Sequence, residues 1–344
     1  MDEQPKEKVT KKKRTEFFKN YGWIIVACLG VMSILFLLGT VVTVKLKIPT
    51  EGDEVIKKLI DIHLWDYFKG QHAYDWTMYV MVALLALGTV CICLQRFKKG
   101  LASAASMLFI LGMMMGILSR EFYASNEIEH MSSVSFGWGS NCSVALSMMA
   151  AVISLSIDFS ENPLVTREIA ENGILIAAAF ILNIIRIPLG STGGSVNFQM
   201  LPLFVIALRH GPARGLVCGG IIYGLLTCLT DGYGFACYPF DYLVGFGGVM
   251  VMGFFRNLIL SKDQQWYNVK GEIFLFVSAL IATFIRFAGS TASSMIIYKL
   301  DFVGALTYNA LYIPISGLIA IAAIMAAYGP LAKIHHQYPV NRTL

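Results

Sequence analysis

Apolar segments of membrane-spanning length recur along almost the whole chain, and they restrict the folds that it can adopt. A bilayer core about 30 Å thick needs around 20 mostly apolar residues in a helix, because every backbone amide must be satisfied within the segment. Ten segments meet or approach this length, near residues 22–45, 76–95, 101–118, 140–157, 172–188, 198–209, 214–230, 240–255, 271–289 and 303–328. Segment 198–209 is short and segment 140–157 is rich in serine, which is typical of transporter helices that line a cavity. The pattern predicts an all-α, polytopic membrane protein with about ten transmembrane helices.

The composition excludes several classes of protein. Hydrophobic residues make up 56% of the chain and charged residues 14%, whereas a soluble domain carries roughly 25% charged residues. A nucleic-acid-binding module, a disordered chain and an ordinary cytosolic enzyme are therefore excluded as first interpretations. The 7 cysteines are too few and too scattered for a disulfide-stapled secreted domain.

Motifs for catalysis and for energy coupling are missing from the sequence. It contains no G-x-x-x-x-G-K-[ST] phosphate loop, no G-x-S-x-G nucleophile elbow and no H-E-x-x-H zinc motif. The histidines show no metal-ligand spacing. We therefore expect neither an enzyme nor a bound cofactor or metal. If the chain moves a solute uphill, the energy must come from an ion gradient or from another subunit.

Basic residues indicate how the chain is oriented in the membrane. The run KKKR, residues 11–14, precedes the first span, and the positive-inside rule places it in the cytoplasm. With ten spans, most of the 27 Lys and Arg residues fall on that same side. The first span is too long, and too lacking in a cleavage site, for a removable signal peptide. We expect a multi-pass protein of the cell membrane with both termini in the cytoplasm.

A polar loop divides the chain into two blocks. The segment FSENPLVTREIAEN, residues 159–172, is the longest polar break on the predicted cytoplasmic side. It separates a four-span block in residues 1–160 from a six-span block in residues 161–344. The first block has two long predicted outer loops, 46–75 and 119–139, and nothing in it indicates a role. The second block holds most of the glycines and of the membrane-embedded polar groups.

Ionisable residues gather near the predicted outer ends of spans in the six-span block. Asp231 and Asp241 flank one outer loop, and Arg186 and Arg286 lie at the ends of two other spans. Such groups inside a membrane indicate function, because burying one without a partner costs several kcal/mol. The aromatic residues around them are Tyr233, Phe235, Tyr238, Phe240, Tyr242, Phe287 and Tyr298. Carboxylates beside aromatic faces suit a flat, cationic heteroaromatic ligand. Asp–Arg pairs that pin helices together, with aromatics at the membrane interface, are an equally weighted alternative.

Two further features concern partners and motion. Gly173 and Ala177 form a small-x-x-x-small pair, and Ala178 and Ala179 broaden the smooth face. Internal helix packing and the docking of a partner explain this face equally well. The glycine-rich loop LGSTGGS, residues 189–195, is interpreted as a plain connector, with a lid over a site as the alternative.

Four stretches of the six-span block carry the signature of a known family. They are NFQMLPLFVIALRHGPARGLVCGGIIYGLL (197–226), YPFDYLVGF (238–246), FIRF (284–287) and LTYNALYIPIS (306–316). With these stretches, residues 167–328 resemble the substrate-capture (S) subunits of energy-coupling-factor (ECF) vitamin transporters, and among them the thiamine-specific type. Residues 1–160 have no counterpart in the six-span core of that family.

The resemblance implies a six-helix membrane protein that binds a vitamin at its outer face. Such S subunits dock on a separate transmembrane coupling protein, which two ATP-binding subunits drive. The docking contact in the family is a smooth, alanine-rich face on its first helix. Gly173, Ala177, Ala178 and Ala179 fall on that face.

The resemblance also implies ligand contacts. Asp241 falls where the thiamine type has a glutamate that contacts the aminopyrimidine ring, and Asn309 matches a ligand-binding asparagine. Tyr298 takes the place of a tryptophan that stacks on the ligand, and Ser290 takes the place of a histidine. A tyrosine expected five residues before Asn309 is Gly304, and the first outer loop lacks an expected tryptophan. The expected substrate site is completed by Tyr238, Tyr242, Arg286 and Asp231.

We therefore expect a membrane subunit that captures thiamine, or a related small heteroaromatic vitamin or precursor, and that separate ATPase and coupling subunits energise. Two alternatives stay open. A self-contained secondary transporter would use all ten spans, with Arg286 and Asp231 in a coupling pathway. A membrane sensor or scaffold would use the four N-terminal spans as its working part.

Overall fold

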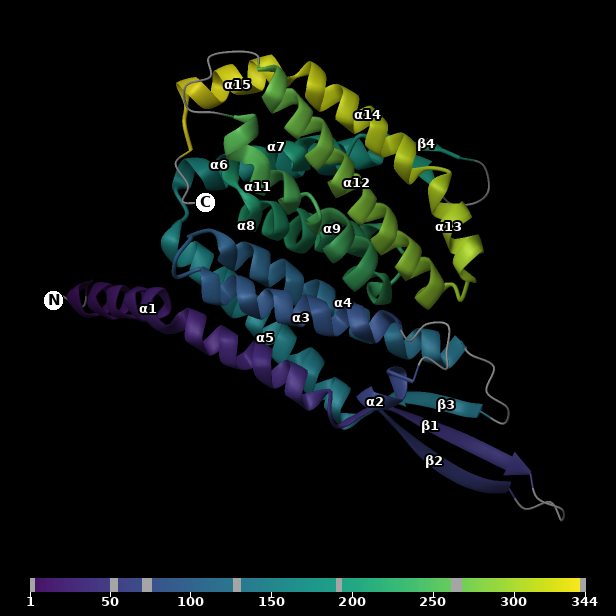
Figure 1. The fold of residues 1–344 in the computed structure, drawn as a ribbon. Helices are drawn as coiled ribbons and strands as arrows, with labels where there is room; N and C mark the ends of the chain where they lie inside the picture. The colour runs from purple at the N-terminus through teal and green to yellow at the C-terminus, as the bar shows by residue number, and fades with distance from the viewer. Residues whose placement is uncertain are drawn as a thin grey trace. The chain divides into compact units, whose positions relative to one another are not determined.

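The computed structural model describes residues 4–49, 55–69, 76–125, 131–189, 194–260 and 268–340 (Figure 1). The chain folds as two compact units, Met1–Glu161 and Asn162–Thr343. Within the described residues, 7 helices are long and apolar enough to cross a membrane: Trp76–Leu94, Leu101–Arg120, Trp138–Glu161, Pro212–Asp231, Phe235–Ile259, Val269–Ile297 and Phe302–Ala326. The prediction of an all-α, polytopic membrane protein is confirmed.

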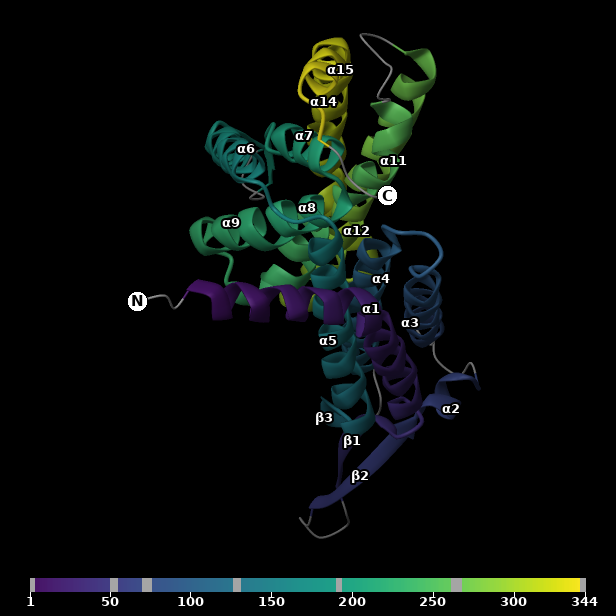
Figure 2. The ribbon, with the colours of Figure 1, turned by 90° about the vertical axis from the view of Figure 1, so that its left-hand side faces the viewer.

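Four long helices build the N-terminal unit. They are α1 (Gln4–Phe36), α3 (Trp76–Leu94), α4 (Leu101–Ser125) and α5 (Trp138–Glu161). Helix α1 packs on α3 and α5, and α4 packs on the same two helices; Figure 2 shows α1 and α5 side by side. Met78, Met81 and Leu85 of α3 and Phe109 of α4 are fully buried. The apolar core of this unit therefore lies between its helices.

The serines of predicted segment 140–157 face another helix. The Ser33 hydroxyl oxygen on α1 lies 2.9 Å from that of Ser143 and 2.8 Å from that of Ser147, both on α5. All three side chains are fully buried. Hydroxyl groups that bond across a helix pair satisfy one another without water. This is why a serine-rich segment forms one continuous 24-residue helix.

A three-stranded antiparallel sheet in the N-terminal unit was not predicted. Strands β1 (Thr40–Pro49), β2 (Val55–His63) and β3 (Met131–Phe136) have the order β2-β1-β3, and the short helix α2 (Leu64–Tyr67) follows β2. The prediction that the first span continues to residue 45 is wrong, because α1 ends at Phe36 and β1 begins at Thr40. The sequence TVVTVKLK from residue 40 is rich in β-branched residues, which favour a strand over a helix.

The C-terminal unit is built from six helical segments within the described residues (Figure 1). The first two are α6 (Thr166–Ile184) and α7 (Met200–His210), joined through the two-stranded ladder of β4 (Ile187–Pro188) and β5 (Ser195–Val196). The third consists of α8 (Pro212–Gly215), η2 (Leu216–Tyr223) and α9 (Gly224–Asp231); the fourth of η3 (Phe235–Cys237), η4 (Tyr238–Val244), α10 (Gly245–Gly247) and α11 (Met250–Ile259). The fifth is α12 (Val269–Ile297), and the sixth consists of α13 (Phe302–Ala310) and α14 (Ile313–Ala326), with the short α15 (Tyr328–Gln337) after it.

Two π-helical turns, η2 and η4, pack against each other in the C-terminal unit. A side chain at Gly220 would meet the backbone carbonyl of Leu243, and one at Gly224 would press on Tyr242. At Gly220 only glycine allows this close approach, because a Cβ there would lie 2.6 Å from that carbonyl oxygen. A π-turn is uncommon and often marks a functional position in a helix. Here η4 carries Asp241 at its first turn.

Three of the ten predicted spans are not among the seven long apolar helices of the described chain. The apolar part of α1 is Asn20–Phe36, and α7 has only 11 residues. Helix α6 carries Arg167, Glu168 and Glu171 in its first two turns. The division of the chain at residue 160 and the two roles assigned to its halves stay predictions.

Candidate ligand-binding site

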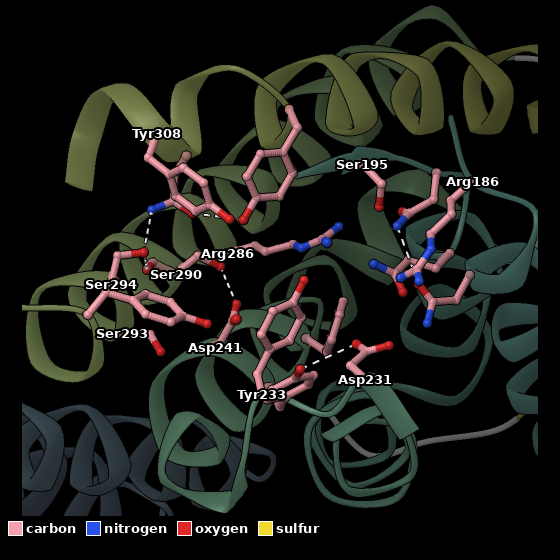
Figure 3. Close-up of a pocket in the computed structure, with 18 residues that line it drawn as sticks. Arg186, Ser195, Asp231, Tyr233, Asp241, Arg286, Ser290, Ser293, Ser294 and Tyr308 are labelled. Atoms are coloured by element: carbon pink, nitrogen blue, oxygen red, sulfur yellow. Dashed lines mark hydrogen bonds between the residues drawn. The ribbon is translucent and has the colours of Figure 1, made fainter. Parts of the chain in front are cut away.

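A pocket of about 80 Å³ opens in the C-terminal unit (Figure 3). Residues from the ends of α6, α7, α9 and α12 meet there with η4 and the start of the last helical segment. The residues that line it are Asn183, Arg186, Ser195, Asn197, Gln199, Asp231, Tyr233, Asp241, Tyr242, Phe246, Arg286, Ser290, Ser293, Ser294, Tyr298, Tyr308, Asn309 and Tyr312. Polar groups thus converge from segments far apart in the sequence.

Two carboxylates face this pocket, each held by one hydroxyl. The Ser290 hydroxyl donates a hydrogen bond to Oδ1 of Asp241, and the Tyr242 hydroxyl donates to Oδ2 of Asp231 at 3.3 Å. Asp231 is the last residue of α9, which ends there because Gly232 takes a left-handed conformation with φ of 77°. Each carboxylate keeps further acceptor positions, since an ionised carboxylate has about four lone-pair sites.

Two arginines line the same pocket. Arg286 on α12 is only 6% exposed, and its guanidinium carbon lies 4.8 Å from the centre of the Phe246 ring. Within the described part of the chain, its Nε and Nη1 have no hydrogen-bond partner. Arg186, just beyond α6, is exposed. Neither arginine forms an ion pair with Asp231 or Asp241 among the described residues, so the charges of this pocket are gathered but not directly paired.

Amide side chains are a further part of the polar lining. Asn309 is almost fully buried; its Nδ2 donates to Oγ of Ser294 and to the carbonyl of Ala305, both at 2.9 Å. Its Oδ1 accepts from the Tyr312 hydroxyl at 2.9 Å. Asn309 is therefore fixed in one orientation before any ligand arrives, and a ligand contact would have to share or replace one of these bonds.

Tyrosines surround the pocket with different exposures. Tyr233 and Tyr298 are 44% and 47% exposed. Tyr233 lies between Gly232 and Gly234, whose φ angles are 77° and 91°, and a Cβ at either glycine would meet nothing within 4 Å. Neither glycine is therefore required by a close contact at its Cβ position; both are required by their positive φ angles.

The structure brings together seven of the eight residues predicted for the substrate site. Asp231, Asp241, Tyr242, Arg286, Ser290, Tyr298 and Asn309 all line the pocket. Tyr238 lies outside the lining: its hydroxyl donates to the carbonyl of Gly220 at 3.3 Å, and its ring stacks on Phe235. Polar residues on α6 and around β5 were missed, namely Asn183, Ser195, Asn197 and Gln199. The N-F-Q sequence before an apolar helix was the one signal for them.

The small-residue face of α6 is only partly open. Gly173 and Ala177 are exposed, and a Cβ at Gly173 would meet nothing within 4 Å. Ala178 is half-buried, whereas Ala179 is fully buried in the core of the unit. Large apolar side chains flank the open part, with Ile174 71% exposed. Residues 190–193 of the predicted connector or lid lie outside the described residues.

A second charge cluster, at the other end of α6 and α7, consists of Glu168, Glu171, Arg209, His210 and Arg214. Arg209 binds Glu171 with two nitrogens, Nε to Oε1 and Nη2 to Oε2, the latter at 3.1 Å. Arg214 Nε donates to Glu168 Oε1 at 2.9 Å. His210 lies between the two carboxylates, with its ring nitrogens 4.0 Å from Glu168 and 3.6 Å from Glu171. In this cluster, each of the two glutamates therefore forms an ion pair with an arginine.

Comparisons with known proteins find one family and two similar proteins. Residues 169–335 match the family described as "Thiamine transporter protein (Thia_YuaJ)". The thiamine transporter ThiT of Bacillus subtilis (strain 168) is 30% identical over 164 residues, which cover 43% of this chain and 83% of that protein. A solved structure described as native-SAD phasing for ThiT from Listeria monocytogenes shares 20% identity, with a TM-score of 0.41, over 47% of this chain and 92% of the other.

The matched segment contains all the residues that line the pocket and most of the C-terminal unit. The N-terminal unit lies outside it. The prediction of a transporter, and not an enzyme, is confirmed by this match. The chain belongs to the thiamine transporter family, and its resemblance to thiamine-type S subunits is thereby confirmed.

Proposed function

We propose that the C-terminal unit captures thiamine, or a close heteroaromatic relative, in the pocket around Asp231 and Asp241. The observation that carries this proposal is the pair of carboxylates, which share one tyrosine-lined pocket without an ion pair to its arginines. Thiamine is a cation with a flat aminopyrimidine ring and a flat thiazolium ring. Carboxylates and aromatic faces are the groups that attract such a cation.

The proposed role of each residue follows from its chemistry. Asp241, oriented by Ser290, accepts hydrogen bonds from the aminopyrimidine ring. Tyr298 stacks on a ring of the ligand, because its half-exposed face has room for one. Asp231, oriented by Tyr242, balances the positive charge of the thiazolium. Asn309, whose amide group is fixed, sets the position of the edge of a ligand ring. Tyr238, the first residue of η4, acts indirectly by donating a hydrogen bond to the Gly220 carbonyl on η2.

Binding requires the pocket to widen. Its volume of about 80 Å³ is below the roughly 300 Å³ at which ligand pockets of small molecules begin. Tyr233 lines the pocket between Gly232 and Gly234, whose φ angles are positive. In this proposal the two glycines let the backbone that carries Tyr233 shift as the ligand enters.

We further propose that separate subunits supply the energy for uptake, as in the ECF transporters that the chain resembles. The sequence has no phosphate loop of its own. The exposed face of Gly173, Ala177 and Ala178 on α6 would dock on a transmembrane coupling protein, because small residues let two helices approach closely. Ala179 packs inward and takes no part in this contact.

A binding assay with the full chain in detergent tests the ligand. Thiamine should bind saturably and without ATP, with a Kd in the low micromolar range or below, about −8 kcal/mol or better. A panel of other water-soluble vitamins should compete much more weakly than thiamine or its pyrimidine and thiazole precursors. If thiamine and both precursors fail to bind to folded protein, the assignment of the ligand is wrong.

An uptake assay tests the energy source separately. The chain alone in liposomes should not accumulate thiamine under a proton or sodium gradient. Addition of the coupling protein and the ATP-binding subunits should give ATP-dependent accumulation. Gradient-driven accumulation by the chain alone would instead identify a self-contained secondary transporter.

A further inference from the structure

A second cavity, of about 460 Å³, lies in the N-terminal unit and has no part in the function proposed above. It forms where α1, the turn between α3 and α4, and the end of α5 meet. Its lining includes Tyr21, Trp23, Gln95, Arg96, Lys99 and Glu161. Helices α3, α4 and α5 are all long and apolar enough to cross a membrane. Their shared end therefore lies at the boundary between lipid and water.

The floor of this cavity is a fixed polar junction. Gln95 is 4% exposed; its Nε2 donates to Glu161 at 2.9 Å, and its Oε1 accepts from the backbone of Ala102 at 2.8 Å. One side chain thus joins the ends of α3 and α5 to the start of α4. Gly100, with φ of 92°, allows the sharp change of direction into α4. The turn from residue 95 to residue 100 is consequently held in one place.

Positive charge and aromatic rings gather on the walls of the cavity. The Arg96 guanidinium carbon lies 5.7 Å from the centre of the Trp23 ring. Lys99 is exposed at the same wall, and Lys98 is exposed beside it on the turn. With the single carboxylate of Glu161, the lining keeps a net positive charge. A group with negative charge is the ligand that such a wall attracts.

An exposed aromatic residue indicates that the ligand belongs to the membrane. Phe97, on the same turn, is 85% exposed. Ile24 and Leu94, on the two helices that flank the cavity, are also exposed. Aromatic and apolar side chains at the ends of spans lie among lipids, while neighbouring Lys and Arg reach the head groups.

We propose that this cavity binds the head group of an anionic phospholipid. The phosphate lies between Arg96 and Lys99, and the acyl chains follow the apolar flanks of α1 and α3 past Ile24 and Leu94. A soluble phosphate ester shares the chemistry of the head group but lacks these apolar contacts. The N-terminal unit would accordingly provide a lipid-binding site that is separate from the vitamin pocket.

Native mass spectrometry of the full chain tests this proposal. Protein in detergent is titrated with phosphatidylglycerol, with phosphatidylcholine, and with soluble glycerol phosphate. Phosphatidylglycerol should bind at least tenfold more tightly than either of the others. The double variant Arg96→Gln/Lys99→Gln should lose about 30-fold in affinity for phosphatidylglycerol, equivalent to about 2 kcal/mol. The matched control Lys57→Gln/Lys58→Gln, which removes two exposed charges on β2, should change nothing.

Two results of the titration overturn the proposal. Equal binding of phosphatidylcholine excludes an anionic site, and equal binding of glycerol phosphate reassigns the cavity to a soluble ester. If the double variant does not fold, tryptophan quenching by brominated phosphatidylglycerol in the wild-type chain decides the question. Trp23→Phe should then remove most of the saturable quenching. Unchanged quenching in that variant places the lipid elsewhere.

Discussion

The two ends of the C-terminal unit use the same kinds of charged residue in different ways. Helix α6 separates them by about 20 Å, at 1.5 Å per residue. In the charge cluster, Glu168 and Glu171 each meet an arginine directly. In the pocket, Asp231 and Asp241 meet hydroxyl groups instead, and Arg286 rests on an aromatic ring. Paired charges hold helices together, whereas gathered but unpaired charges are available to a ligand. Variants at the two ends of the unit distinguish these two roles.

The largest expected effect is at the paired end. Glu168→Gln removes the charge that faces Arg214, whose side chain is 2% exposed. Breaking a buried pair in this way should lower the free energy of unfolding by about 3–5 kcal/mol. Thermal unfolding in detergent measures the loss. The thiamine affinity of the fraction that stays folded should be unchanged; a variant as stable as the wild type would show that the pair does not hold the helices.

An intermediate effect is expected at the pocket. Tyr298→Ala removes the proposed stacking face and should weaken thiamine binding by about 5- to 30-fold, or roughly 1–2 kcal/mol. Stability should hardly change, because the side chain is half-exposed. Tyr298→Phe keeps the ring and is the matched control, with wild-type affinity in calorimetry. Equal weakening by both variants would point to the hydroxyl and not to stacking.

A smaller effect is expected at the mouth of the pocket. Gly232 has a φ of 77°, so Gly232→Ala should cost about 1 kcal/mol of stability through backbone strain alone. Gly173→Ala is the control, since it lies inside helix α6 with open space around it. That change should stabilise slightly, by about 0.5–1 kcal/mol. The two variants should change the free energy of unfolding in opposite directions. A change in the same direction would show that backbone strain at Gly232 does not explain the effect.

The smallest expected effect is on the pH dependence of the free energy of unfolding. Burial, aided by nearby Arg256, lowers the pKa of His335 to about 4. The unfolded state, with an ordinary histidine pKa near 6.5, binds the proton first. Stability should therefore fall as the pH drops from about 6.5 towards 4, and His335→Gln should reduce this fall. Unfolding curves at a series of pH values measure it; an unchanged slope in the variant would assign the effect to other groups.

The all-α fold class and most of the pocket residues could be predicted from the sequence, because both depend on local residue types. Long apolar runs require helices in a membrane, and ionisable residues within them stand out singly, as Asp241 and Arg286 did. Other features depend on contacts between distant segments. The start of β1, at Thr40, is predicted as the end of the first span, because β-branched apolar residues suit a strand and a span equally well until a partner strand is known. Asn197 lines the pocket because the chain turns there into α7, and the position of this turn depends on contacts with other segments. Tyr238 lies outside the lining because its hydroxyl binds the Gly220 carbonyl on η2 and its ring stacks on Phe235.

The most direct test compares thiamine binding and thermal unfolding in the same two variants, Asp241→Asn and Glu168→Gln. We expect Asp241→Asn to lose about 10- to 100-fold in affinity with nearly unchanged unfolding, since it removes one charged hydrogen-bond acceptor. Asp301→Asn, at an exposed helix cap outside the pocket, is the control and should bind normally. Glu168→Gln should show the reverse pattern, with lower stability and normal affinity. Wild-type affinity in folded Asp241→Asn would contradict the account of the site.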